Sequence, residues 1–130
     1  LVFNFKKQKK SVNSFFSKKS SDGSIVFFGA GHHGITFVNI MKIKKYVECF
    51  IDDVVEKQKL LIPGSYLPIY SSSYLKNNKV STCIISVSQE NEELVFNKIK
   101  SVLDKTANIF SIFPDSPISL PIYKELEKII

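Results

Sequence analysis

The chain of 130 residues contains no arginine, no tryptophan and only two cysteines. Nucleic-acid-binding proteins rely on arginine for bidentate contacts to phosphates and bases, so its absence argues against a nucleic-acid partner despite a net charge of +6. No apolar run approaches the ~20 residues of a membrane-spanning helix, and the start lacks an apolar signal-peptide core. We therefore expect no membrane partner and a cytoplasmic location.

Cysteine and histidine are too sparse for a disulfide framework or a metal centre. Cys49 and Cys83 each lie within an apolar, strand-like run, and there is no C-x-x-C motif. His32 and His33 are adjacent, so a regular helix or strand cannot aim both at one ion. We predict two reduced core thiols and no metal site.

The positive charge is concentrated at the start of the chain. Residues 1–20 hold six lysines and no acid, whereas residues 21–130 hold twelve lysines and twelve acids. Apolar residues recur among the first lysines at roughly helical spacing: Phe5, Val12, Phe15 and Phe16. The spacing predicts a basic amphipathic helix over 1–22, docked on the domain, on a missing neighbouring domain or on a second copy. Because the chain begins with Leu1, we expect a piece of a longer protein.

Three of the five glycines lie in one stretch, Gly29-Ala30-Gly31-His32-His33-Gly34. An apolar run over 24–28 precedes it and a helical pattern follows it, which is the order of a dinucleotide-binding βαβ unit with G-x-G-x-x-G spacing. Gly29 would form the tight turn, Gly31 would admit a ligand to the backbone, and Gly34 would let the helix pack closely. The free N–H groups at the helix start would favour an anion.

Strand-like runs alternate with helical patterns through the rest of the chain. We expect further strands near 46–51, 82–87 and 108–113, an edge strand near 67–70, and helices from Ser88 to about Lys105 and over about 121–130. The alternation predicts an α/β fold over 23–130, a small Rossmann-like three-layer sandwich with a mostly parallel sheet of about five strands in the order 3-2-1-4-5. A ligand would bind at the carboxyl ends of the first and fourth strands.

Several candidate binding residues share that rim of the sheet. Asp52 lies 18 residues after Gly34, near the position of a ribose-binding acid, and Asp53 follows it. The two acids fit a ribose contact or a cap for the loop equally well. Ser88 begins the helix after the fourth strand, as an N-cap or as a ligand contact.

Aromatic and histidine side chains supply the remaining candidates. His32 and His33 at the turn tip could touch a substrate or face water. Tyr66, Tyr70 and Tyr74 fit either core packing or stacking on a base. No Ser-His-Asp or Cys-His arrangement is evident, so the catalytic residues stay unassigned.

The glycine turn resembles a motif of the C-terminal domain of sugar C-methyltransferases. The family pattern G-A-x-x-K-G-N-T-x-x-N is similar to residues 29–39, with His33 in place of the lysine and Ile35 in place of the asparagine. Any ligand contact made by those two polar groups is therefore altered or lost here.

Later segments extend the resemblance to about residues 10–100. An aspartate-ended strand occupies 50–53, followed by lysines at 57 and 59. Residues 62–69, which include Pro63 and Gly64, are similar to the family pattern P-G-x-x-I-P-I.

The resemblance implies the C-terminal domain of an S-adenosylmethionine-dependent sugar C-methyltransferase. Such a domain binds a nucleotide sugar or completes the substrate cleft and does not transfer the methyl group alone. The cofactor, S-adenosylmethionine, and the methyl-transfer residues belong to a central domain, which a zinc-binding domain precedes; neither is present here. The expected substrate-binding residues are Gly29, Gly31, His32, His33, Gly34, Asp52, Asp53, Pro63, Gly64 and Ser88.

Three alternatives stay open. The turn is also similar to the G-A-G-G-H-G turn in the N-terminal, nucleotide-sugar-binding domain of sugar acyltransferases, although the hexapeptide repeats of those proteins are absent. An NAD(P)-binding oxidoreductase fragment would lack its substrate domain. A ligand-free interaction module would dock through exposed Phe5, Phe15 and Phe16, and its self-association would distinguish it.

Overall fold

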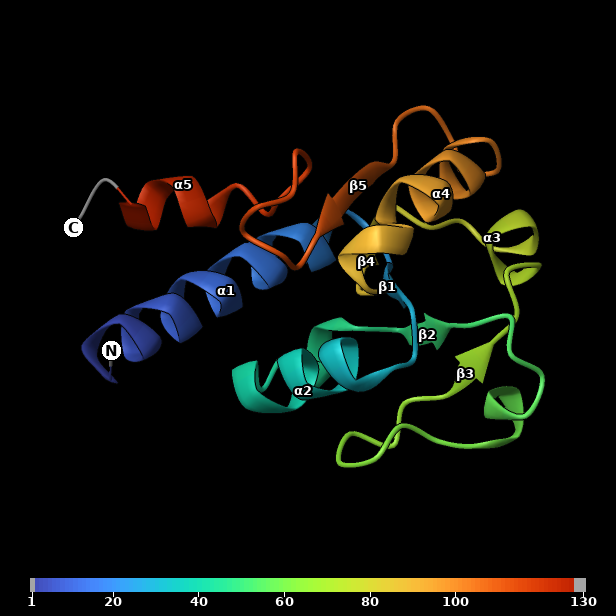
Figure 1. Ribbon diagram of the computed structural model, residues 1–130, viewed down its shortest axis with the longest axis horizontal. Coiled ribbons are helices and arrows are strands. Elements are labelled where there is room, and N and C mark those ends of the chain that lie inside the picture. The colour runs from blue at the N-terminus through green and yellow to red at the C-terminus, as the bar shows by residue number, and fades with distance from the viewer. Residues whose placement is uncertain (1, 128–130) are drawn as a thin grey trace.

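The computed structural model describes residues 2–127 (Figure 1). Its helices are α1 (Val2–Asp22), α2 (His32–Met41), α3 (Tyr74–Asn77), α4 (Gln89–Lys100) and α5 (Ile122–Glu127). Its strands are β1 (Ile25–Phe28), β2 (Cys49–Ile51), β3 (Ile69–Tyr70), β4 (Thr82–Ile85) and β5 (Asn108–Ser111). Short 3-10 helices cover Lys44–Tyr46 and Lys57–Lys59.

The five strands form one parallel sheet in the order β3-β2-β1-β4-β5. The predicted α/β fold and strand order are therefore confirmed. Phe28 pairs with Ile51 on one side and with Ile85 on the other, so β1, β2 and β4 end together. We call this side of the sheet the carboxyl edge; the loops that follow the strands all leave from it.

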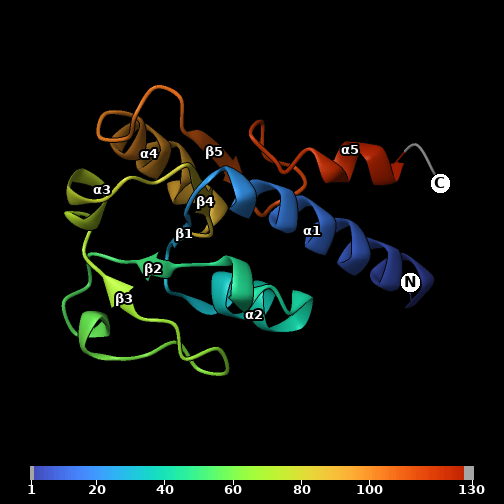
Figure 2. The same ribbon diagram turned by 180° about the vertical axis from the view of Figure 1, so that it is seen from behind.

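Helices cover both faces of the sheet, which confirms the three-layer sandwich (Figures 1 and 2). Alternate residues of β1 point to opposite faces, as the pleat of a strand requires. Ile25 and Phe27 face the layer of α1, α2 and α5. Val26 and Phe28 face α3 and α4. Both faces are apolar, which explains why these strands read as unbroken apolar runs.

Helix α1 packs on the domain through its aromatic stripe. Val12 and Phe16 are fully buried, and Phe16 stacks on Phe27 with the ring centroids 6.0 Å apart. Phe15 meets Phe110 edge-on at 5.6 Å. Asn13 donates from Nδ2 to the Met41 carbonyl at 2.8 Å, which ties α1 to the end of α2. The helix thus belongs to the sandwich, and Phe15 and Phe16 are not free for the docking that an interaction module would need.

Some element boundaries differ from the sequence prediction. The second strand was expected over 46–51 but spans only Cys49–Ile51, because Lys44–Tyr46 forms a 3-10 helix. Helix α4 ends at Lys100, five residues before the expected end, because the N–H groups of Val102 and Leu103 both donate to the Ile99 carbonyl. The last expected helix is present as α5; residues 128–130 lie outside the described part. Within residues 2–127, every helix is too short or too polar to cross a membrane.

Candidate functional site

The first and third glycines of the turn are required by close packing. Gly29 has φ +115°, and a Cβ there would lie 2.8 Å from Val87 Cγ1 and 3.0 Å from the Val87 nitrogen. A Cβ on Gly34 would lie 2.5 Å from Ser86 Oγ and 2.9 Å from the Gly29 carbonyl oxygen. These contacts agree with the predicted roles of a tight turn and a closely packed helix.

Gly31 differs from the other two because nothing lies within 4 Å of the position where its Cβ would be. It is the N-cap of α2, with φ −111° and ψ −172°, and no side chain caps the helix. The first helical hydrogen bond runs from the Ile35 N–H to the Gly31 carbonyl, at 3.1 Å. The N–H groups of His32, His33 and Gly34 therefore precede the helical ladder and carry the positive end of the helix dipole. The structure leaves this backbone open to an approaching anion.

Asp52 fastens the glycine turn to β2. Its Oδ2 accepts a hydrogen bond from the Ala30 N–H at 2.9 Å, and its Oδ1 accepts one from the Val54 N–H at 3.0 Å. Lys57 Nζ lies 3.5 Å from Oδ2, and the Asp52 side chain is only 13% exposed. The spacing between turn and acid thus has a structural explanation, since the carboxylate closes the turn from the neighbouring strand.

Asp53 links the end of β2 to α4 and to the segment before α3. Its Oδ1 accepts a hydrogen bond from the Ser72 N–H at 2.8 Å, and its Oδ2 pairs with Lys98 Nζ. Burial acts to raise the pKa of Asp53, but the hydrogen bonds from Lys98 and Ser72 outweigh it and lower the pKa below its usual value. The Lys98 amine also lies over the Phe28 ring, 5.9 Å from its centroid. No sequence motif marks Lys98, so the sequence did not predict this pair.

The two histidines lie exposed in the first turn of α2. Their ring centroids are 5.9 Å apart, and His33 meets the Phe113 ring edge-on at 5.1 Å. A shallow, mostly apolar cavity of about 250 Å³ runs beside them, lined by His32, His33, Thr36, Phe37, Ile40, Met41, Ile112 and Phe113. The segment that follows β5 therefore forms one wall, which the sequence did not indicate. Within residues 2–127, no three His, Cys, Asp or Glu side chains gather as metal ligands would.

Pro63 and Gly64 do not join the glycine turn. Asn39 Nδ2 donates to the Pro63 carbonyl at 2.9 Å, and a Cβ on Gly64, which has φ +90°, would lie 2.5 Å from the same Nδ2. Asn39 follows His32 by seven residues, which places it about 10 Å along α2 from the open N–H groups. These two motif residues clamp the β2–β3 connection to α2. The cavity beside Gly64, about 350 Å³, is a separate one lined by Val38, Asn39, Lys42, Lys44, Lys45 and Gly64.

Serines occupy the part of the carboxyl edge next to β4. Ser88 is the N-cap of α4, as predicted, but its side chain makes no capping bond and accepts a hydrogen bond from Asn91 Nδ2 at 3.0 Å. Buried Ser86 donates to the Gly29 carbonyl at 2.8 Å and so holds the turn from the β4 side. Ser116 donates to Glu92 at 2.5 Å, which fixes the loop after β5 against α4. Sequence reasoning missed Ser86 and Glu92 because their partners are distant in the chain.

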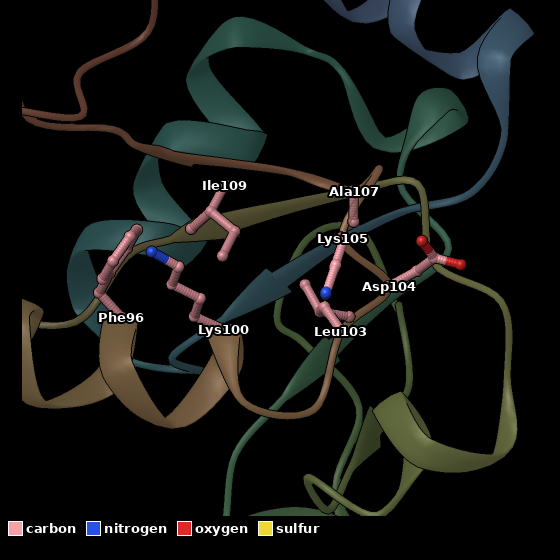
Figure 3. Close-up of a pocket in the computed structure, with 7 residues that line it drawn as sticks. All are labelled: Phe96, Lys100, Leu103, Asp104, Lys105, Ala107 and Ile109. Atoms are coloured by element: carbon pink, nitrogen blue, oxygen red, sulfur yellow. The ribbon is translucent and has the colours of Figure 1, made fainter.

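A larger cavity, of about 420 Å³, lies at the opposite end of the sheet (Figure 3). Its lining residues are Phe96, Lys100, Leu103, Asp104, Lys105, Ala107 and Ile109. Ala107 precedes β5 and Ile109 lies near its start, so this cavity is remote from the ends of the strands where the glycine turn lies. It is not part of the candidate site.

The parallel sheet, the glycine turn and the uncapped helix at the point where strand order reverses define a Rossmann-like domain. Residues 3–114 match the family described as the C-methyltransferase C-terminal domain, and the chain belongs to this family. The match confirms the resemblance and covers more of the chain than the motifs did.

One solved structure similar to this chain is that of UDP-D-quinovosamine 4-dehydrogenase from Vibrio fischeri. Its TM-score is 0.55 at 23% identity, over 69% of this chain and 77% of that one. At this identity, the likeness shows the fold. No curated protein sequence matches the chain.

Proposed function

We propose that this domain holds the nucleotide-sugar substrate of a sugar C-methyltransferase, with the diphosphate at the first turn of α2. The observation that carries the proposal is the open backbone at Gly31, where three N–H groups precede the helical ladder and no side chain caps them. Membership of the C-methyltransferase C-terminal domain family supports a role beside a methyltransferase. The similar Vibrio fischeri structure is that of a UDP-sugar enzyme, which supports this class of ligand.

The sugar would lie on the β5 side of the turn. His32 and His33 are exposed there and offer ring nitrogens to sugar hydroxyl groups. The neighbouring cavity of about 250 Å³ is mostly apolar, which suits the C–H face of a sugar ring packed against Phe113. In this arrangement His33, which replaces the lysine of the family pattern, contacts the substrate through its imidazole ring.

The residues of this edge do not suit S-adenosylmethionine, which carries a sulfonium cation. The open N–H groups of α2 attract anions, and the carboxylates of Asp52 and Asp53 are already engaged by Lys57 and Lys98. We therefore place the cofactor and the methyl-transfer residues in another domain of the parent protein. The role of this domain is to bind and orient the sugar nucleotide.

A substitution at Gly31 tests the proposal. The backbone angles of Gly31 suit an N-cap aspartate, so Gly31→Asp should cap α2 and bring a negative charge to the diphosphate position. We expect affinity for UDP-glucose or dTDP-glucose to fall about 10- to 150-fold, the range for a lost charged hydrogen bond. Calorimetric titration measures the affinity, and Gly31→Asn, whose side chain has nearly the same shape as aspartate but no charge, is the matched control that should retain more affinity than Gly31→Asp.

Stability separates this effect from misfolding. The aspartate cap should leave the melting temperature unchanged or raise it. Equal nucleotide-sugar affinity in Gly31→Asp and in the unsubstituted chain would contradict the proposal, as would a panel in which only NAD(P)H binds.

A further inference from the structure

Tyr70 presents an exposed aromatic ring at the carboxyl edge. It is the last residue of β3, and its side chain is 44% exposed. One face of the ring stacks on Tyr74, with the centroids 5.0 Å apart and the planes 6° from parallel. Among residues 2–127, Tyr74 is the single ring that contacts Tyr70. With 44% of its side chain exposed, Tyr70 keeps surface that is accessible to a further flat group.

The supporting ring is held in place. Tyr74 is partly buried against the apolar cluster of α3 and α4, and its hydroxyl group lies near the Cys49 side chain. Burial, together with the nearby Cys49 and Glu48, raises the pKa of Tyr74 to about 12, so its hydroxyl stays protonated at neutral pH. The Tyr70 backbone is fixed as well, because its carbonyl accepts the Asp52 N–H at 2.9 Å. The stacked pair is a preorganised platform, which limits the ordering cost of binding.

The platform lies at a suitable place relative to the open helix terminus. Tyr70 ends β3, two strands from β1, and a separation of about 4.8 Å per strand puts its backbone about 10 Å along the edge from the end of β1, with its ring on the α3 side of the sheet. A nucleoside diphosphate spans a comparable length from base to outer phosphate. The cavity beside His33 lies on the other side of the turn, towards the segment after β5.

We propose that Tyr70 is the stacking site for the base of the nucleotide sugar, with the diphosphate at α2 and the sugar beside His33. The inference rests on the proposed function and adds the direction in which the ligand lies along the sheet edge. Stacking on tyrosine uses the π-face that every base possesses. Pyrimidine and adenine nucleotides both have a base that could stack on Tyr70. We assign this position to the base of a nucleotide sugar because the open N–H groups of α2 favour a diphosphate.

The test compares three variants with four probes. Titrations of UDP-glucose, dTDP-glucose, S-adenosylmethionine and inorganic pyrophosphate are made on the unsubstituted chain, Tyr70→Ala, Tyr70→Phe and Tyr66→Ala. Tyr66 is the matched control: it is also an exposed tyrosine, at 71%, but it precedes β3 in the connection clamped to α2. Circular dichroism melts confirm that each variant is folded.

We expect Tyr70→Ala to bind the nucleotide sugars roughly 5- to 150-fold more weakly, the range for loss of one base–aromatic stack. Pyrophosphate affinity should not change, and Tyr70→Phe and Tyr66→Ala should bind like the unsubstituted chain. Unchanged nucleotide-sugar affinity in Tyr70→Ala, or an equal loss for pyrophosphate, would overturn the inference while the proposed function stood. Loss of S-adenosylmethionine binding alone would assign the platform to the adenine of that cofactor and overturn the assignment to a nucleotide sugar. Failure of the unsubstituted chain to bind any nucleotide would overturn both proposals.

Discussion

Gly29→Ala should destabilise the domain strongly, whereas Gly31→Ala should not. At Gly29 the backbone has φ +115°, and the new methyl group would meet Val87 Cγ1 at 2.8 Å and the Val87 nitrogen at 3.0 Å. Strain in this backbone region costs about 1–3 kcal/mol, and overpacking costs a further ~1–3 kcal/mol. The Gly29→Ala variant has lower conformational entropy in its unfolded state, which offsets about 0.4–1 kcal/mol of this loss. The net loss in free energy of unfolding is therefore about 2–5 kcal/mol.

That loss corresponds to a fall in melting temperature of roughly 7–18 °C for a chain of this length. At Gly31 there is no atom within 4 Å of the new methyl group and φ is −111°, so the free energy of unfolding should change by less than about 1 kcal/mol. Urea titrations and thermal melts followed by circular dichroism measure both variants. Equal stability of the two variants would refute the packing argument for the turn.

Two further predictions concern titratable groups. The pKa of Asp53 is lowered in the folded state, so its pair with Lys98 should stabilise the fold above the usual Asp pKa of about 4 and lose that contribution as pH falls below it. Asp53→Asn should therefore weaken the fall in melting temperature at acid pH. The pair is partly exposed, so its contribution to the free energy of unfolding should be less than about 1 kcal/mol. An unchanged fall in melting temperature at acid pH would contradict the assignment. Burial raises the pKa of Cys49 to about 12 and that of Cys83 further, so both thiols should resist a disulfide reagent until the chain unfolds. The rate of labelling is measured by the absorbance of the thiolate that the reagent releases. Rapid labelling of the native protein would contradict the burial of the two thiols.

Much of the fold was predictable because local patterns and tertiary structure agree. The run 24–28, the glycine turn and the following helix formed as expected, since each is specified by neighbouring residues. The late start of the second strand was less predictable. Tyr46 and Val47 continue the apolar pattern of the strand, yet Lys44–Tyr46 forms a 3-10 helix in the connection from α2 to β2.

The candidate site was predictable in position but not in its detailed contacts. Asp52 and Gly31 lie at the expected edge, yet the sequence could not show that Asp52 bonds to Ala30 while Gly31 stays open. The resemblance to the family motif places Pro63 and Gly64 among the expected binding residues. The structure instead packs them on Asn39, a contact across 24 residues that no local pattern encodes.

The most direct test of the central claim is a titration of nitrogen-15-labelled protein with dTDP-glucose or UDP-glucose, followed by amide chemical shifts. The account predicts that the largest shifts fall on the N-cap Gly31 and on His32, His33 and Gly34, whose N–H groups begin α2. Shifts confined to the cavity between α4 and β5, or no shift at concentrations that saturate other nucleotide-sugar proteins, would contradict it.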